Sequence, residues 1–194
     1  MVAPLVVGLA LFGMGEGFLV ASHWGATPWT VFAQGLSRHL GWSLGWSTAL
    51  ISALVLVAWW PLRERPGIGT LTNLVIIAYA LDLTASHVAT PEDPLGRAAL
   101  MVGGVLAIGA GSALYLTTGL GPGPRDGLMT SLHRHLHVSV VYVRLALEIT
   151  VLVVGWLMGG VVGVGTAFFA LTIGFSIGAS LQLLERCVHW ASRD

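Results

Sequence analysis

The sequence has few charged residues. Asp, Glu, Lys and Arg together occupy 9% of its 194 positions, whereas soluble globular domains contain about 25%. Hydrophobic residues make up 55% of the chain, and its mean hydropathy is +0.83. This composition excludes a soluble globular domain and predicts an integral membrane protein.

Basic clusters and cysteine pairs are also lacking. The formal net charge is +0, and no block of basic residues could neutralise nucleic acid phosphates, so nucleic acid is excluded as a partner. Cys187, the single cysteine, has no second thiol with which to form a disulfide or a metal site. The first apolar run contains Glu16 and follows no basic stretch, so we expect a retained membrane span there rather than a cleavable signal.

What the sequence does contain is an internal repeat. Residues 121–127 read Gly-Pro-Gly-Pro-Arg-Asp-Gly, and 96 positions earlier residues 25–30 read Gly-Ala-Thr-Pro-Trp-Thr. The same shift places Gly-Val-Gly-Thr at 163–166 on Gly-Ile-Gly-Thr at 67–70. Two unrelated glycine motifs that share one spacing predict a duplicated unit.

Six apolar runs have a length close to the roughly 20 residues that a membrane-spanning helix needs. They lie at about 4–22, 42–62, 68–87, 97–117, 138–158 and 164–184. The predicted fold class is therefore all-α, a polytopic membrane protein with a single membrane domain over 1–194. Repeat 1 covers about 4–89 and repeat 2 about 100–185. Because each repeat has three spans, an odd number, the second must be inverted relative to the first.

Each repeat also contains a segment that is too short and too polar to cross the membrane. These segments begin at Pro28 and Pro124, which suit the first turn of a helix because proline lacks an N–H and its φ is already helical. We therefore expect one short helix in each half. Either both are broken or re-entrant helices whose starts reach the middle of the bilayer, or both lie flat at the membrane surface.

Three runs in the second half point to a family. They are Gly-x-Gly-Pro-Arg-Asp-Gly-Leu-Met at 121–129, Val-Arg-x-x-x-Glu at 143–148 and Gly-Trp-x-x-Gly-Gly-x-x-Gly-x-Gly-Thr at 155–166. In these runs, and over nearly its whole length, the chain resembles the YczE and YitT group of bacterial integral membrane proteins. It looks closer to YczE, since YitT-type members often add a soluble C-terminal domain. The first half departs from the group's Gly-Pro-Trp-Asp by having Thr-Pro-Trp-Thr at 27–30. The resemblance implies an architecture and a bacterial inner-membrane location rather than an activity.

Basic residues in the loops predict the orientation of the chain in the membrane. One side of the membrane would hold Arg63, Arg65, Arg125, Arg134, Arg186 and Arg193. The opposite side would hold only Arg38 and Arg97. The arginine-rich side is expected to be cytoplasmic. Both termini are then expected inside the cell.

The two breaks are candidate binding sites. A helix start carries about half a positive charge together with unpaired N–H groups, so two starts at the middle of the bilayer would attract an anion or carboxylate. The substrate-binding residues predicted at the breaks are Thr27, Pro28, Gly123, Pro124, Arg125 and Asp126. Arg125 adds a full positive charge. On the alternative interpretation, with the helices at the surface, Asp126 merely offsets the dipole of its own helix.

Four ionisable residues fall within the predicted spans, where a charge costs roughly 3 kcal/mol and needs a partner or water. Glu16 is flanked by glycines that allow another backbone to approach, and we expect it in the substrate site, with a role in proton coupling. Arg144 and Glu148 are four positions apart on one helix face, so they either pair with each other or bind an anionic substrate. Asp82 either acts in the site or lies at the membrane interface.

These features predict a small-solute transporter or permease in which one half rocks against the other; an organic anion is one candidate solute. The alternative is a non-catalytic membrane partner or assembly factor for another enzyme or complex. We do not expect an enzyme, a cofactor or a metal site. A nucleophile paired with a base is lacking, and His133, His135 and His137 are two positions apart and so point in different directions on a helix. The expected partners are the lipid bilayer and an unknown small solute, and a homodimer is left open.

Overall fold

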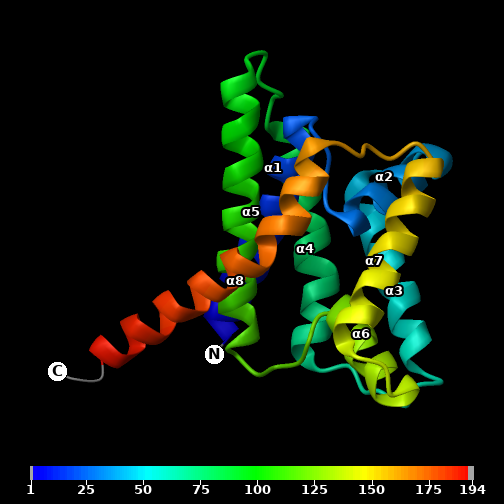
Figure 1. Ribbon diagram of the computed structural model, residues 1–194, viewed down its shortest axis with the longest axis vertical. Coiled ribbons are helices and arrows are strands. Elements are labelled where there is room, and N and C mark those ends of the chain that lie inside the picture. The colour runs from blue at the N-terminus through cyan, green and yellow to red at the C-terminus, as the bar shows by residue number, and fades with distance from the viewer. Residues whose placement is uncertain (1, 192–194) are drawn as a thin grey trace.

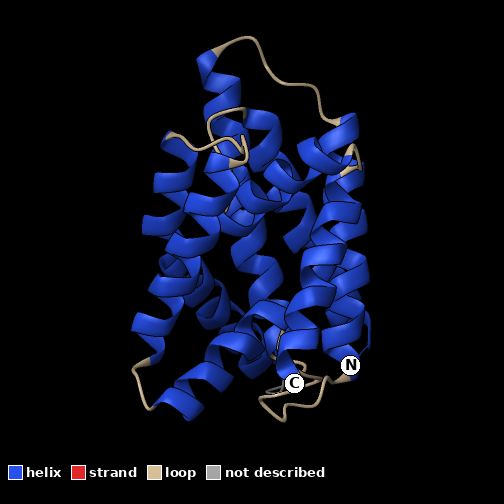
Figure 2. Ribbon diagram, turned by 90° about the vertical axis from the view of Figure 1, so that its right-hand side faces the viewer, coloured by secondary structure: helices blue, strands red, loops and turns tan. Residues whose placement is uncertain are grey.

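The fold is that of a computed structural model, which describes residues 2–191 and the side chains as far as residue 186. No strand occurs within residues 2–191, and the chain is all-helical, as predicted (Figure 2). The helices are α1 (Val2–Ser22), α2 (Pro28–Leu40), α3 (Leu44–Trp59), α4 (Ile68–His87), α5 (Pro94–Leu116), α6 (Pro124–Leu136), α7 (Val140–Leu157) and α8 (Val164–Ala191).

Five of these helices are long and apolar enough to cross a membrane: α1, α4, α5, α7 and α8. A sixth crossing is reached if α2 and α3, which are bent by 112° at a short break, count as one broken span. With 16 residues, α3 is about 24 Å long at 1.5 Å per residue, shorter than the hydrocarbon core of about 30 Å. The second expected run, at about 42–62, thus contains a shorter helix than predicted, because Ser43 caps its start and the helix ends at Trp59.

Helices in the two halves begin at positions 96 apart, which we call equivalent positions. Pro28, Leu44 and Ile68 begin α2, α3 and α4, and their equivalents begin α6, α7 and α8. In Figure 1, each of α1, α3 and α4 runs in the direction opposite to that of its counterpart in the second half, which is α5, α7 and α8, respectively. The turns agree as well, since Gly25 and Gly121 have φ of +114° and +118°.

The two short helices begin inside the bundle. In Figure 1 the chain turns back after α1 and again after α5, so that α2 and α6 start near mid-height and run outward to opposite ends. Pro28 and Pro124, the two predicted starts, are the first residues of these helices, and both are buried. Thr27 caps α2 by accepting a hydrogen bond from the Thr30 N–H over 3.2 Å, whereas α6 has no side-chain cap.

The helices pack as two units, each of which mixes the halves (Figure 1). The α1 unit contains α1, α4, α5 and α8, and its buried core includes Leu9 and Ile108. The α2 unit contains α2, α3, α6 and α7, with Trp29, Ile51 and Trp59 among its buried residues. A site between the two units would therefore receive side chains from both halves of the sequence.

Glycines bring α1 and α5 into backbone contact at the centre of the α1 unit. A Cβ atom added at Gly15 would lie 2.6 Å from the carbonyl oxygen of Gly104, and one at Gly104 would lie 2.8 Å from that of Gly15. Gly8 and Gly111 approach each other in the same way. No larger residue fits at these positions without moving the helices apart.

The α1 and α2 units are joined along α3 and α4, but not along the equivalent pair, α7 and α8. Asp82 of α4 accepts hydrogen bonds from Ser43 Oγ (2.8 Å) and from the Gly45 N–H (2.9 Å) at the start of α3. The equivalents of Asp82 and Gly45 are Gly178 and Val141, which cannot form this contact. Among the residues that the structure describes, α7 and α8 do not pack extensively on each other. We call the line between these two helices the seam.

Candidate functional site

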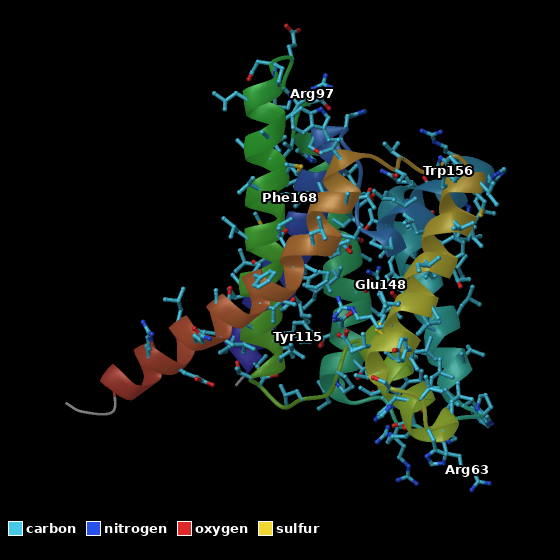
Figure 3. The ribbon with its side chains drawn as sticks, in the orientation of Figure 1. Arg63, Arg97, Tyr115, Glu148, Trp156 and Phe168 are labelled. Atoms are coloured by element: carbon cyan, nitrogen blue, oxygen red, sulfur yellow. The ribbon has the colours of Figure 1, made fainter. Side chains whose placement is uncertain are left out.

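A cavity of about 370 Å³ lies between the α1 unit and the α2 unit. Figure 3 shows Glu148 and Tyr115, two residues of its lining, between the ends of the structure that carry Arg63 and Arg97. All nine residues predicted as substrate-binding line this cavity: Glu16, Thr27, Pro28, Gly123, Pro124, Arg125, Asp126, Arg144 and Glu148. The structure thus brings the starts of both short helices together with charged residues of α1 and α7.

Much of the lining consists of equivalent residues from the two halves. These pairs are Phe12 and Ile108, Glu16 and Ser112, Thr27 and Gly123, Pro28 and Pro124, Trp29 and Arg125, Thr48 and Arg144, Ser52 and Glu148, Asn73 and Phe169, and Ile77 and Ile173. The charges are not shared equally. The first half contributes Glu16 alone, and every other charged residue of the lining comes from the second half.

Glu16 and Arg125 form an ion pair in the cavity. Arg125 Nη1 donates to Glu16 Oε1 over 3.1 Å, and Thr27 Oγ1 donates to the same oxygen over 3.2 Å. The guanidinium also lies over the ring of Trp29, 5.1 Å from its centroid, in a cation–π contact. Glu16 is fully buried and the Arg125 side chain is 18% exposed, so each charge depends on the other for compensation.

Two buried polar atoms of the lining have no hydrogen-bond partner among the described residues. They are Glu16 Oε2 and Thr48 Oγ1. Leaving a buried polar atom unpaired costs about 1–3 kcal/mol, and such atoms usually find a partner in protein, water or ligand. A bound molecule that reaches either atom would supply the missing hydrogen bond.

Asp126 has a structural contact as well as a place in the lining. Its Oδ2 accepts a hydrogen bond of 2.6 Å from the Tyr115 hydroxyl, which ties the start of α6 to α5. It also lies in the first turn of α6, where a negative charge is favourable beside the positive end of the helix dipole. This position beside the dipole is the one expected on the alternative interpretation, in which Asp126 offsets the dipole of its own helix.

Arg144 and Glu148 pair with each other and also face the cavity. Arg144 Nε donates to Glu148 Oε1 over 2.9 Å, as their spacing predicts. Pairing with each other does not exclude the second expected role, binding of an anionic substrate, because both residues line the cavity. On the other side of the seam, α8 contributes only apolar residues to the lining: Phe169, Ile173 and Ile177.

The loops that lead into the short helices are held by the opposite half. Gly69 N–H, at the start of α4, donates to the carbonyl oxygen of Leu120 over 2.9 Å. The equivalent bond, from Gly165 N–H of α8 to the carbonyl oxygen of Trp24, measures 2.7 Å. Irregular backbone inside a membrane protein needs protein or water partners for its polar atoms, and these bonds supply one such partner in each half.

Several lining residues were not predicted from the sequence. Thr48 and Ser52 could have been found, because they are the equivalents of Arg144 and Glu148. Trp29 could have been found in the same way, as the equivalent of Arg125. Nothing in the sequence pattern indicates Tyr115, whose place depends on how α5 packs beside α6.

One expectation needs correction. Arg125 does not belong among the loop residues counted for the orientation, because α6 turns back into the bundle and places the side chain against Glu16. Asp82, for which a role in the site and a position at the membrane interface were both left open, is absent from the cavity lining and accepts hydrogen bonds at the start of α3. Arg193 and the side chain of Cys187 lie outside the described residues.

Comparison with known proteins places the chain. Residues 2–181 match DUF6198, a family of unknown function. The chain belongs to this family. This DUF6198 chain is 43% identical over 188 residues to an uncharacterized protein of Haemophilus influenzae, a match that covers 97% of this chain and 86% of that protein.

Two proteins of Bacillus subtilis are also similar to this DUF6198 chain. The uncharacterized membrane protein YczE is 35% identical over 170 residues, with 84% of this chain and 79% of YczE covered. The uncharacterized protein YyaS is 23% identical over 192 residues, with coverage of 97% and 94%. No solved structure matches. The expected likeness to YczE is confirmed, and together with the apolar helices it identifies a multi-pass membrane protein.

Proposed function

We propose that this protein carries a small solute across the bacterial plasma membrane through the cavity between its two units. The observation that supports the proposal is the composition of the lining, which combines both short-helix starts, the Glu16–Arg125 ion pair and equivalent residues from both halves. Sites for small ligands have volumes of about 300–1,000 Å³, and transporters often build theirs from broken helices at a repeat interface.

The proposal includes an inverted 3+3 repeat, with repeat 1 at about 4–89 and repeat 2 at about 100–185. It is supported by the opposite helix directions in Figure 1 and by the exchanged hydrogen bonds of Gly69 and Gly165. Both termini would be cytoplasmic. Support comes from loop arginines at one end, Arg63 among them, and from Arg97 at the other (Figure 3).

We propose further that the moving bodies are the α1 unit and the α2 unit rather than the two sequence halves. α1 and α5 come from different halves, yet the glycine contacts at Gly15 and Gly104 hold their backbones together. The units, by contrast, are joined along α3 and α4, whereas α7 and α8 pack little on each other at the seam. Rotation about the α3–α4 contact would change access to the cavity while leaving the α1–α5 contact intact.

Uptake into proteoliposomes tests the proposal. The purified chain would be offered organic anions and other small solutes under imposed proton and sodium gradients. We expect Arg144→Ala to reduce uptake by roughly tenfold or more, because a charge-assisted contact to the solute is lost. Arg65→Ala removes the same charge from an exposed loop and should leave uptake near that of the unmodified chain. If no solute enters under any gradient, the carrier proposal is wrong.

A second candidate is a non-catalytic membrane partner or assembly factor. It is favoured by the low burial of α7 and α8. Only 11% of the residues in the apolar stretch of each helix are buried inside the protein, against 44–56% in α1, α4 and α5. A defined protein that co-purifies in stoichiometric amount and covers α7 and α8 would support this candidate. A chain that purifies alone and transports solute would exclude it.

A further inference from the structure

The unpartnered carboxylate oxygen in the cavity indicates one group that a ligand can supply. Glu16 Oε1 already accepts from Arg125 and Thr27, but the buried Oε2 accepts nothing from the described residues. An ionised carboxylate oxygen can only accept, so its partner must be a donor such as an ammonium group. A simple organic anion has no such donor.

Arg144 indicates a second group. Its Nε is engaged by Glu148, and its terminal N–H groups form no hydrogen bond with the described residues. The side chain is 47% exposed and lines the cavity. The planar edge of a guanidinium suits carboxylate or phosphate oxygens, so an acidic group of the ligand would bind here.

The balance of charges favours a ligand that has both groups. The lining contains three carboxylates, from Glu16, Asp126 and Glu148, and two guanidinium groups, from Arg125 and Arg144. An anion would add a fourth negative group beside the carboxylates, and a cation would face both guanidinium groups. A zwitterion brings no net charge and can pair with both kinds of group.

On one side of the seam, α8 supplies an apolar wall beside these charges. Phe169 and Ile173 of α8 are buried, and Ile177 continues the wall on the same helix. The equivalents of Phe169 and Ile173 in the first half are Asn73 and Ile77, so Phe169 is the position at which the α8 side of the cavity is more apolar than the α4 side. Arg144 and Glu148 lie on α7, across the seam.

We propose that the ligand is a zwitterion with an apolar substituent. Its ammonium group donates to Glu16 Oε2, its acidic group binds Arg144, and its apolar group lies against the α8 wall. The inference rests on the proposed function and names its substrate class. Both a free amino acid with a large apolar side chain and a single-chain ethanolamine phospholipid have this chemistry.

Binding to the purified full chain tests the ligand class separately from transport. The probes are phenylalanine, phenethylamine, which lacks the carboxylate, and 3-phenylpropionate, which lacks the ammonium group. A second set compares lysophosphatidylethanolamine with lysophosphatidic acid. We expect one of the zwitterions to bind at least about tenfold more tightly than the matched compounds that lack one of its charged groups, and the set in which this occurs identifies the source. Equal binding of acid and zwitterion, or no binding of any probe, overturns the proposal.

Two variants assign the contacts. Arg144→Gln should weaken binding of the zwitterion and the acid but not of the amine, and its half-exposed position allows the variant to fold. Glu16→Gln should weaken binding of the zwitterion and the amine but not of the acid. Equal loss for all three compounds would contradict the proposal. Selective binding without uptake would refute the carrier while leaving the ligand class intact, and uptake of acids that lack an ammonium group would do the reverse.

Discussion

Arg125 of α6 and Glu16 of α1 are 109 positions apart in the sequence, and their side chains meet in a 3.1 Å ion pair at the centre of the protein. Because Glu16 is fully buried, removal of the Arg125 charge leaves the carboxylate uncompensated. We expect Arg125→Gln to lower the free energy of unfolding by about 3–5 kcal/mol. The Glu16→Gln/Arg125→Gln double variant should lose less than the sum of the single variants. Denaturant unfolding in detergent measures all four proteins, and additive losses would show that the pair is not coupled.

The contact between α3 and α4 predicts a difference between two equivalent serines. Ser43 donates to Asp82 and caps α3, whereas Ser139 forms no side-chain cap at the start of α7. Ser43→Ala should therefore destabilise the protein by about 1–2 kcal/mol. Ser139→Ala is the matched control and should have little effect. Equal thermal shifts for the two variants would argue against a specific joint between α3 and α4.

The seam can be closed by giving α7 and α8 the residues that join α3 to α4 in the first half. Val141→Gly with Gly178→Asp places on α7 and α8 the residues that join α3 to α4, where Asp82 meets Gly45. We expect this double variant to favour packing of α7 on α8 and to restrict entry to the cavity. The readout is the rate at which a thiol reagent labels Ile173→Cys in a Cys187→Ser background. Slower labelling is expected, and Val141→Ala with Gly178→Ala serves as control.

Neighbouring glycines of α5 should differ in their tolerance of alanine. A Cβ at Gly104 meets the backbone of Gly15 at 2.8 Å, whereas one at Gly103 meets nothing within 4 Å. Gly104→Ala should force α1 and α5 apart and destabilise the protein by about 1–3 kcal/mol. Gly103→Ala should be neutral or slightly stabilising, because alanine has the higher helix propensity. Thermal unfolding of the two purified variants would decide, and a similar loss in both would refute the α1–α5 packing.

The unpartnered hydroxyl of Thr48 provides a test that is independent of the ion pair. Thr48→Val removes an atom that bonds to no described residue, so the stability of the ligand-free protein should be maintained or rise slightly. The stabilisation given by a saturating ligand should fall. Thermal shift assays with and without the ligand measure both effects. A large loss of stability without ligand would mean that the hydroxyl has a structural partner.

The positions of the short helices and of the candidate site could be predicted because their causes are local. A proline such as Pro28 or Pro124 sets the first turn of a helix wherever the helix later packs. Glu16 and Arg144 had to face protein or water because they lie in apolar spans. The nine residues that residue type and spacing selected all line the cavity, and their role in binding stays a prediction.

The partners of these residues could not be predicted, since they depend on how distant helices return to one another. The shared spacing of the two glycine motifs also has its physical reason only in the structure. A Cβ at Gly25 would lie 2.5 Å from Thr166 Oγ1, and one at Gly121 would lie 3.0 Å from Thr70 Oγ1. The first glycine motif of each half, at 25–30 or 121–127, thus packs against the second glycine motif of the other half, at 163–166 or 67–70. No local rule in the sequence specifies which segments meet in this exchanged way.

The interface of α3 with α6 differs in one respect from the equivalent interface of α7 with α2. Trp59 fills the space above Gly127, where a Cβ would lie 2.1 Å from the indole ring. The equivalent of Trp59 is Gly155, which packs closely on Phe32, and the equivalent of Gly127 is Val31. Two copies of the first half would drive valine into tryptophan, and two copies of the second would leave glycine facing glycine. The halves have thus become mutually dependent, so neither severed module is expected to rebuild the parent molecule by pairing with itself.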